Sequence, residues 1–475
     1  MIFNSVQFFI FFIIVFGLYL VLNHRWQNRM LLVASYVFYG TWDWRFLSLI
    51  WISTWVDYYI GNKIAGSADK IRSKKYMLVS IVVNLAFLGF FKYFNFFISS
   101  FIGLFSIFGV QLDYPTLKVI LPVGISFYTF QSMSYTLDIY YGRLVPSKKF
   151  SDFALFVAFF PQLVAGPIER ATHLLPQITN PRKLSLEKFY EGCYLILWGL
   201  FLKVFVADNL ASIVDPIFME TTTFYKEQVL LGAYAFAFQI FCDFAGYSSI
   251  ARGTALCMGF DIMHNFNIPY FAVNPSDFWR RWHISLSTWL KDYLYIPLGG
   301  NKGCPWKTFR NLMLTMLLGG LWHGASWTFV LWGAYHGVIL ILYRIVEPEV
   351  RNFCLKNKII RAGLKVVGII LFFHIVCYGW ILFRAQSFEQ IMVMTKVLFC
   401  SRFTFSFLEW WNLFGGFIFY VWFLMVVQTY QYWKNDLMAV YKSHWLIKGV
   451  FYYLCIMMII IYGVTDAKDF IYFQF

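Results

Sequence analysis

One histidine inside an apolar stretch is the residue of this chain best suited to chemistry. Residues 319–337 read Gly-Gly-Leu-Trp-His-Gly-Ala-Ser-Trp-Thr-Phe-Val-Leu-Trp-Gly-Ala-Tyr-His-Gly and hold two of the eight histidines. Because an ionisable residue is costly in hydrocarbon, a histidine in such a segment indicates a functional site. A near-neutral imidazole can take a proton from a hydroxyl at physiological pH. We therefore predict that His323 is a general base; the alternative is a structural histidine bonded to a neighbouring carbonyl.

The second histidine of this stretch, His336, lies thirteen residues after His323. On one continuous helix this separation places the two side chains about 20 Å apart along the axis and on different faces. They can cooperate only if the glycines break the helix. We therefore predict a packing or cavity-lining role for His336 and seek the partner of His323 elsewhere.

A cationic and aromatic segment, residues 274–300, supplies that partner. It opens with Asn-Pro-Ser-Asp, a typical helix start. Steps of three and four residues predict a single helix with two faces, an aromatic one of Phe278, Trp282, Leu286, Trp289 and Tyr293 and a polar one of Arg280, His283, Ser287 and Lys291. Such a helix suits the cytoplasmic membrane interface, where its cations can simply anchor headgroups. The sharper hypothesis is that Arg280, Arg281 and Lys291 bind an anionic donor, such as the phosphates of a coenzyme, while His283 points inward.

Asp243 is a carboxylate within an apolar run, Phe-Cys-Asp-Phe-Ala-Gly-Tyr-Ser. A charge there should face the interior of a helical bundle, either as a structural ion pair or as a functional group. The chain has no GxSxG elbow, Walker A loop or HExxH helix. Its eight cysteines include no CxxC pair, so neither a metal site nor a disulfide framework is indicated. His173, like His24 and His444, lies in a connector and receives no predicted role.

Composition defines the elements that must position these residues. The chain of 475 residues is 60% hydrophobic and only 13% charged, whereas soluble domains are about 25% charged. Its apolar runs are continuous rather than alternating, so we predict an all-α, multi-pass membrane bundle of about ten to twelve spans. The net charge of +15 comes from basic links between the runs, which indicates positive-inside topology and headgroup contact rather than nucleic-acid binding. Placing these links in the cytoplasm leaves both termini outside and requires residues 311–343 to be broken or paired.

We predict one integral membrane domain, residues 1–475, that begins with a retained span at residues 1–22. Residues 121–143 carry too many hydroxyl and amide groups for a lipid-facing helix, which indicates a buried helix that lines a cavity. Residues 153–170 are broken by proline and glycine, as in a re-entrant segment. Residues 251–310 are too polar to span and form the predicted amphipathic region at the cytoplasmic interface.

The motifs together resemble those of the membrane-bound O-acyltransferase (MBOAT) family. The likeness rests on Asp-Phe-Trp-Arg-Arg-Trp-His-Ile-Ser-Leu-Ser at 277–287, Asp-Tyr-Leu-Tyr-Ile-Pro-Leu-Gly-Gly at 292–300, and the stretch 319–337. Residues 121–142, 159–170 and 241–248 are similar to the alginate O-acetyltransferase branch. The resemblance thus covers about residues 121–343, the motif-bearing core.

The resemblance implies a helical bundle that encloses a tunnel, with acyl transfer from a cytoplasmic donor to a hydroxyl on the outer side. It makes His323, of the Trp-His-Gly motif, the catalytic residue and His283, of the Arg-Trp-His motif, a supporting one. The candidates for lining the tunnel are Trp322, Ser326, Asp243 and His336. The chain departs from the branch at Ser249 and His264, where acidic residues are expected, and this bears on substrate details more than on the reaction.

The resulting hypothesis is a bacterial inner-membrane O-acetyltransferase that modifies an exopolysaccharide or cell-wall polymer of the alginate kind. Its donor would be acetyl-CoA or a similar acyl thioester, used as a substrate, with no tightly bound cofactor and no metal. Its partners would be membrane lipids, the polysaccharide acceptor and an extracytoplasmic acetyltransferase of the SGNH type. The alternatives are a D-alanyl transferase for teichoic acids and a secondary transporter or polysaccharide exporter that relays protons through Asp243, Lys92 and the histidines.

Overall fold

The computed structural model contains only helices, turns and loops in the residues that it describes, 1–112, 117, 120–164, 166–220, 224–354, 358–464 and 470–471. Seven of these helices are long and apolar enough to cross a membrane, at Lys70–Ile107, Leu186–Met219, Lys226–Cys257, Trp327–Glu349, Gly363–Arg384, Phe407–Lys434 and Trp445–Tyr462. The predicted all-α, multi-pass class is thereby confirmed. Seven spanning helices are fewer than the ten to twelve that we predict. Part of the difference is that an apolar helix such as α1 (Val6–Val21), with 16 residues, is too short to count as a span.

The chain groups into two compact units. Unit 1 comprises Met1–Cys193 and Ala251–Met263, and unit 2 comprises Tyr194–Ile250 and His264–Phe475. Beside α1, the helices within unit 1 are α2 (His24–Asp43), η1 (Trp44–Phe46), α3 (Leu47–Ala65), α4 (Lys70–Leu88), η2 (Gly89–Tyr93), α5 (Phe94–Ile107), α6 (Ile125–Tyr140), α7 (Phe150–Ala158), α8 (Phe160–Leu163) and α9 (Ala171–Thr179). Helices α10 (Leu186–Leu200) and α12 (Lys226–Cys257) contribute residues to both units.

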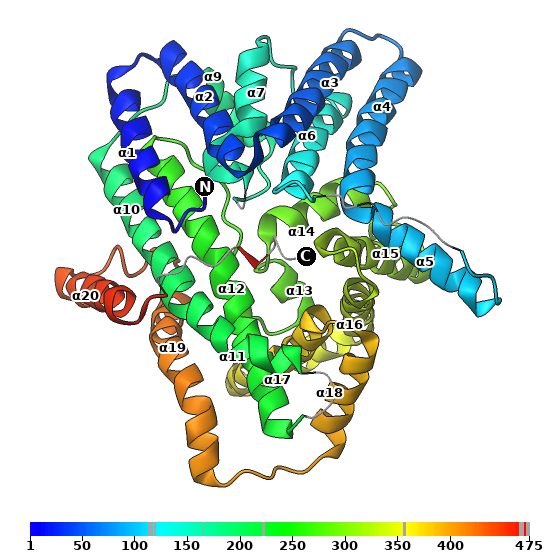
Figure 1. Cartoon of the computed structure of the whole chain (residues 1–475), viewed down its shortest axis with the longest axis vertical. Helices are drawn as coiled ribbons and strands as arrows, with labels where there is room; N and C mark the ends of the chain where they lie inside the picture. Colours follow the sequence, from blue (N-terminus) through cyan, green and yellow to red (C-terminus); the bar gives the residue numbers. More distant parts are fainter. Residues whose placement is uncertain are drawn as a thin grey trace. The chain divides into compact units, whose positions relative to one another are not determined.

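Helix α6 forms the polar core of unit 1. All of its residues from Ile125 to Ile139 are buried, and it packs beside α3 and α4 (Figure 1). The carboxylate of Asp57 on α3 accepts hydrogen bonds from Ser80 (2.6 Å), Asn84 (2.9 Å) and Ser132. Buried polar groups need such partners, so the hydroxyl-rich sequence of α6 serves helix packing. The prediction of a buried helix is confirmed.

The segment that follows is broken, as its prolines and glycines predict. Helix α7 ends at Ala158, and the short α8 ends at Leu163. Gly124 supports this region, because its left-handed φ of 73° is one that side chains rarely adopt and an added Cβ would lie 2.7 Å from the Leu163 carbonyl oxygen.

Unit 2 contains the two histidine motifs. Its helices, beyond its parts of α10 and α12, are η3 (Phe201–Ala207), α11 (Asp208–Met219), η4 (Pro269–Phe271), α13 (Pro275–Trp279), α14 (Ile284–Leu290), η5 (Lys291–Tyr295), α15 (Pro305–His323), α16 (Trp327–Cys354), α17 (Lys358–Arg384), α18 (Phe388–Cys400), α19 (Phe407–Lys434) and α20 (Trp445–Tyr462). Helices α15 and α16 form a tightly packed hairpin, which confirms the prediction that residues 311–343 are broken and paired.

The predicted single helix over residues 275–293 is wrong. The chain forms α13, turns, forms α14 and continues as the π-helix η5, because His283 adopts a left-handed φ of 41°. Main-chain hydrogen bonds hold this turn, from Ile284 to the Asn265 carbonyl (2.9 Å) and from Asn267 to the Arg281 carbonyl (2.9 Å). Tertiary contact with residues 265–267 thus overrides the helical periodicity. The aromatic face is nevertheless buried at Phe278, Trp282, Leu286 and Trp289.

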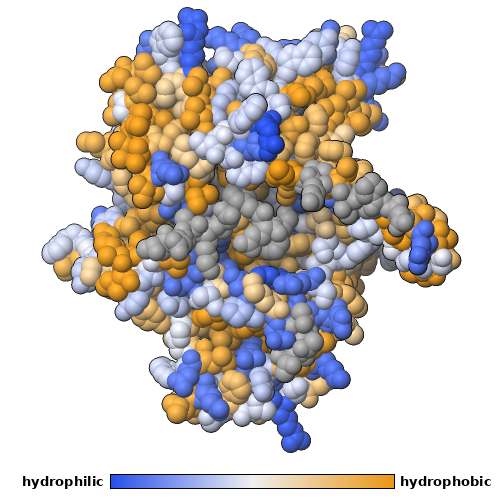
Figure 2. All heavy atoms as spheres, in the orientation of Figure 1, coloured by the Kyte–Doolittle hydropathy of each residue, from blue (hydrophilic) through white to orange (hydrophobic). Residues whose placement is uncertain are grey.

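The exposed surface has the distribution expected of a membrane protein. Apolar side chains cover much of the face drawn in Figure 2, and large ones such as Val6, Ile13 and Val21 on α1 are more than two-thirds exposed. Hydrophilic residues gather over the turn between α3 and α4, where Lys70, Arg72 and the two lysines that follow are exposed. Basic residues therefore flank an apolar helix end here, as positive-inside topology requires.

Candidate active site

His323 is the last residue of α15. The helix ends there because Gly324 is extended, with φ −160° and ψ 153°, and α16 begins three residues later. Ser326 caps α16, since its hydroxyl accepts a hydrogen bond from the Thr328 amide at 3.3 Å. The break leaves the His323 ring at a helix end, where it is only 3% exposed.

Aromatic rings enclose His323. Its ring centroid lies 5.1 Å from Trp322, 5.1 Å from Trp332 and 5.5 Å from Phe383. Trp332 and Phe383 are each 1% exposed. Such surroundings exclude most water and keep the local dielectric low, which strengthens any electrostatic interaction made there.

His283 lies beside His323, with the two ring centroids 6.2 Å apart. Its turn is fixed by Asn265, whose side chain accepts from the Ser285 hydroxyl (2.6 Å) and donates to the Ser248 hydroxyl (3.0 Å). The side chain of His283 is fully buried, and this burial lowers its pKa to about 3. The imidazole is therefore neutral at physiological pH, and the two predicted catalytic residues share one buried site.

The helix break also changes the relation between His323 and His336. Both rings pack on Trp332, with centroid distances of 5.1 Å for His323 and 4.8 Å for His336. His336 is 1% exposed, and neither of its ring nitrogens has a hydrogen-bond partner among the described residues. The helix is broken between His323 and His336, as their cooperation would require. The indole of Trp332, however, lies against both imidazole rings.

The cations predicted to bind the donor differ in their surroundings. Arg280 and Lys291 are exposed, and Lys291 lies 3.8 Å from the Asp292 carboxylate. Arg281 is paired with Asp277 at 2.9 Å and also donates to the Asn267 carbonyl. Because the turn at His283 separates the exposed cations from the buried imidazole, they do not form the single polar face that the periodicity indicated. Their role in donor binding stays a prediction.

Asp243 belongs to a buried ion cluster in unit 2. The Lys203 ammonium lies 2.6 Å from Asp243 and 2.8 Å from Asp208, and all three side chains are at most 4% exposed. The other Asp243 oxygen accepts from the Ile471 amide at 2.7 Å, while Phe470 packs on Phe244, which in turn contacts the ring of His283. The structure shows that Asp243 is ion-paired, and the functional role that the sequence also left open for it stays a prediction. Lys203 is itself a charged residue within an apolar run, and this pattern could have identified it as the partner of Asp243. The pair was not predicted from the sequence.

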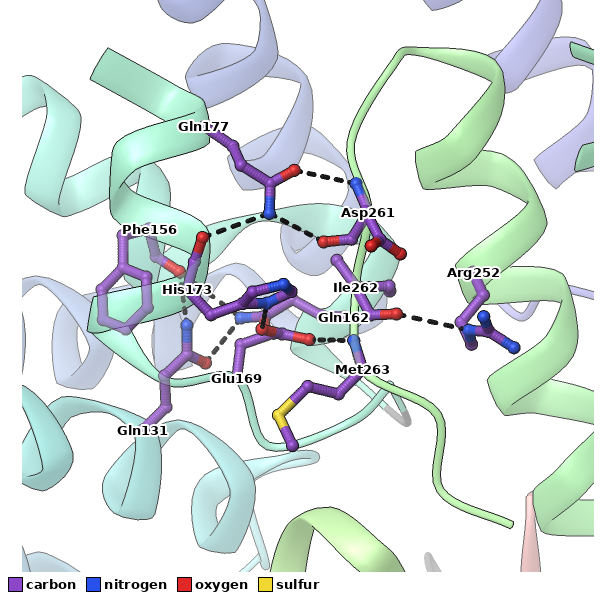
Figure 3. A network of polar contacts seen from close by, with 10 residues as sticks. All are labelled: Gln131, Phe156, Gln162, Glu169, His173, Gln177, Arg252, Asp261, Ile262 and Met263. Atoms are coloured by element: carbon purple, nitrogen blue, oxygen red, sulfur yellow. Dashed lines mark hydrogen bonds and ion pairs between the residues drawn. The ribbon is translucent and has the colours of Figure 1, made fainter. Parts of the chain in front are cut away.

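A second polar network, in unit 1, was also missed (Figure 3). The buried carboxylate of Glu169 accepts a hydrogen bond from the Met263 amide, and its other oxygen lies 2.9 Å from His173 Nδ1. Burial raises the pKa of Glu169, and the bond to that carboxylate raises the pKa of His173. The side-chain amide of Gln177 extends the network, because it donates to the Asp261 carbonyl (2.8 Å) and accepts from the Asp261 amide (2.8 Å). The four-residue spacing of Glu169 and His173 across the start of a helix could have predicted this pair.

Comparison with known proteins places these motifs in one family. The model of the membrane-bound O-acyltransferase family matches residues 37–383. The chain is 44% identical over 403 residues to "Probable alginate O-acetylase AlgI" of Azotobacter vinelandii, which covers 84% of this chain and 78% of that protein. It is 44% identical over 406 residues to the protein of the same name from Pseudomonas aeruginosa, covering 84% and 75%.

A third relative carries a different acceptor in its name. The chain is 34% identical over 400 residues to a peptidoglycan O-acetyltransferase of Helicobacter pylori, which covers 79% of this chain and 74% of that protein. The matched family segment contains the His283–His323 pair, the α15–α16 hairpin and the helix α6. The chain is therefore an O-acyltransferase of the membrane-bound O-acyltransferase (MBOAT) family.

Proposed function

We propose that this enzyme transfers an acetyl group from a cytoplasmic thioester, acetyl-CoA or a similar donor, to a hydroxyl of an extracytoplasmic polysaccharide. The observation that carries the proposal is the buried pair His283 and His323, whose rings lie 6.2 Å apart inside the family-matching segment. The names of two relatives that are 44% identical to this chain, both alginate O-acetylases, support a polysaccharide acceptor.

In this proposal His323 acts as the general base. Its imidazole takes the proton of the acceptor hydroxyl as the oxygen attacks the thioester carbonyl. The carbon–sulfur bond then breaks, and the imidazolium returns the proton to the departing thiolate. The aromatic enclosure limits hydrolysis of the donor by water. His283 is kept neutral by burial and is held in place by its turn. It therefore positions the donor or the base rather than exchanging the proton.

Arg280 and Lys291 are the groups that would attract the phosphates of a coenzyme donor, since both are exposed. A phosphate contact of this kind is charge-assisted and falls as the salt concentration rises. Arg281 would contribute less, because its guanidinium already pairs with Asp277. The outer acceptor step would use a polysaccharide chain or an SGNH-type partner that relays the acetyl group, in the bacterial inner membrane.

The test is ester-linked acetate on the cell-surface polymer of a bacterial host that expresses the full chain. His323→Ala should lower alkali-labile acetate at least 100-fold at equal membrane abundance, on the order of the loss expected for a general base. His283→Ala should also lower it, through lost positioning. The matched control is His444→Ala, because His444 is an exposed cap of α20. Unchanged acetate in both histidine variants would show that the proposed mechanism is wrong. Supplying radioactive acetyl-CoA or a D-alanyl carrier-protein thioester to inverted membranes separates acetyl transfer from D-alanyl transfer.

A further inference from the structure

A groove on the outer face of unit 2 takes no part in the proposed reaction. It has a volume of about 460 Å³ and is lined by α12, η4, α17 and α19. This volume falls within the range of about 300–1,000 Å³ typical of small-ligand sites. Because α12, α17 and α19 are long and apolar enough to span the membrane, the groove faces lipid rather than water.

The groove is lined by hydrocarbon. Phe238, Phe373 and Phe417 form its floor, with Phe238 5.8–6.0 Å from the other two rings, and Ile370 and Ile418 on its rim are about half exposed. The polar Nδ1 of His374 already lies 2.7 Å from the Ile370 carbonyl. The lining therefore favours an unbranched apolar chain over a polar ligand.

One end of the groove carries a positive charge. Phe271 lines the groove and its ring lies 4.8 Å from that of Tyr432 in a tilted arrangement, and the Lys365 ammonium lies 4.8 Å above the Tyr432 ring. Lys365 is exposed and has no carboxylate partner among the described residues. Lys365 and His374, which lines the groove, are nine positions apart on α17. This separation corresponds to a rise of about 14 Å along the helix axis. This length matches half of the hydrocarbon core, which is about 30 Å thick.

We infer that the groove binds an anionic glycerophospholipid, with one acyl chain along α17 and α19 and the headgroup on Lys365. A lipid in one leaflet has its charge at the interface and its chain reaching to the midplane, which is the arrangement of charge and apolar surface found here. The groove also adjoins the layer beneath the active site, because the ring of Tyr270 in its lining lies 6.0 Å from Trp282. Trp282 directly precedes His283 in the chain.

The test measures lipid retention by the full chain in detergent, with neither donor nor acceptor, so its outcome is independent of the proposed acetyl transfer. Native mass spectrometry should show tighter retention of phosphatidylglycerol than of phosphatidylcholine with the same acyl chains. Lys365→Gln should weaken phosphatidylglycerol binding about fivefold, the worth of one interfacial lysine, and leave phosphatidylcholine binding unchanged. The matched control is Lys448→Gln, which removes another lysine stacked on a tyrosine, Tyr441, outside the groove.

A second variant tests the acyl-chain part of the site. Ile418→Trp fills the groove from α19 and should lower the retention of both lipids, while size-exclusion and melting profiles report that the variant is folded. Equal phosphatidylglycerol retention in Lys365→Gln and Lys448→Gln would overturn the headgroup assignment. If Ile418→Trp retains both lipids as well as the wild type does, the groove does not bind a lipid. The same conclusion follows if the substitution changes the mass of the protein oligomer but not the lipid retention.

Discussion

At His283, burial determines the protonation state of the imidazole. The pKa is lowered to about 3 by burial, whereas a histidine in an unfolded chain titrates near about 6.5. Between these values the unfolded chain binds a proton that the folded chain does not. The contribution of His283 to stability is therefore complete above pH ~6.5 and decreases as the pH falls below it.

This difference predicts an acid-sensitive fold. Between pH 6 and 4, the titration of His283 should lower the free energy of unfolding by up to about 1.4 kcal/mol for each unit by which the pH falls. His283→Gln removes the titration, so its melting temperature in detergent should decrease less steeply over that range than that of the wild type, even if it is lower at pH 7. His444→Gln, at an exposed position, is the control. Parallel curves for wild type and His283→Gln would contradict the assignment.

In the proposed mechanism, the rings in contact with His323 also limit the size of the acyl group. Phe383 lies 5.5 Å from His323 and packs on Phe329 (4.7 Å) and Trp332 (5.3 Å). One methylene in a tight apolar pocket is worth about 1–3 kcal/mol of discrimination. Phe383→Leu should therefore raise the propionyl-to-acetyl transfer ratio at least tenfold, measured with both thioesters in competition. The control is Phe373→Leu, in the outer groove, and an unchanged ratio in Phe383→Leu would exclude this wall as the selectivity determinant.

At the scale of helices, the glycines of residues 319–337 bring α15 and α16 together. A Cβ on Gly333 would lie 2.3 Å from the Met316 carbonyl oxygen, and one on Gly320 would lie 2.2 Å from that of Phe329. Small residues at these positions let the two backbones touch. The structure shows these glycines making room for the neighbouring helix, which in turn holds the turn after His323.

This packing predicts a graded series of alanine substitutions. Gly333→Ala meets backbone that cannot move aside and should cost about 1–3 kcal/mol. Gly337→Ala meets the flexible Met313 side chain, at 2.8 Å from its sulfur, and should cost less. Gly17→Ala in α1 meets nothing within 4 Å and serves as the control. Thermal melting in detergent should rank the three in that order, and equal melting temperatures would contradict the close approach.

Elements with one clear signal could be predicted from the sequence, and those decided by tertiary contact could not. Residues 121–143 were expected to be a buried helix because their hydroxyl density cannot face lipid, and α6 is buried throughout. The turn at His283 could not be foreseen, because it depends on hydrogen bonds to residues 265–267, which are adjacent only in the folded chain. The same applies to Glu169, whose partner Met263 is 94 residues away.

At the scale of the whole chain, the cluster around Lys203 is a long-range polar tie within unit 2. It joins η3, α11 and α12 to Ile471, a residue 228 positions beyond Asp243. The π-helical geometry of η3 is typical of functional or strained positions in helices. Here it carries a lysine that pairs with two carboxylates inside the bundle.

Removing this lysine should damage the fold more than removing either of its partners alone. Lys203→Met leaves two buried carboxylates without their shared cation and should cost about 3–5 kcal/mol. Asp243→Asn keeps the contact between Lys203 and Asp208, so its loss should be smaller. Lys442→Met breaks the exposed pair with Asp436, worth about 0–1 kcal/mol, and is the control. Melting temperatures and the yield of monodisperse protein measure the order; if Lys203→Met is no less stable than Asp243→Asn, the lysine is not what holds these segments together.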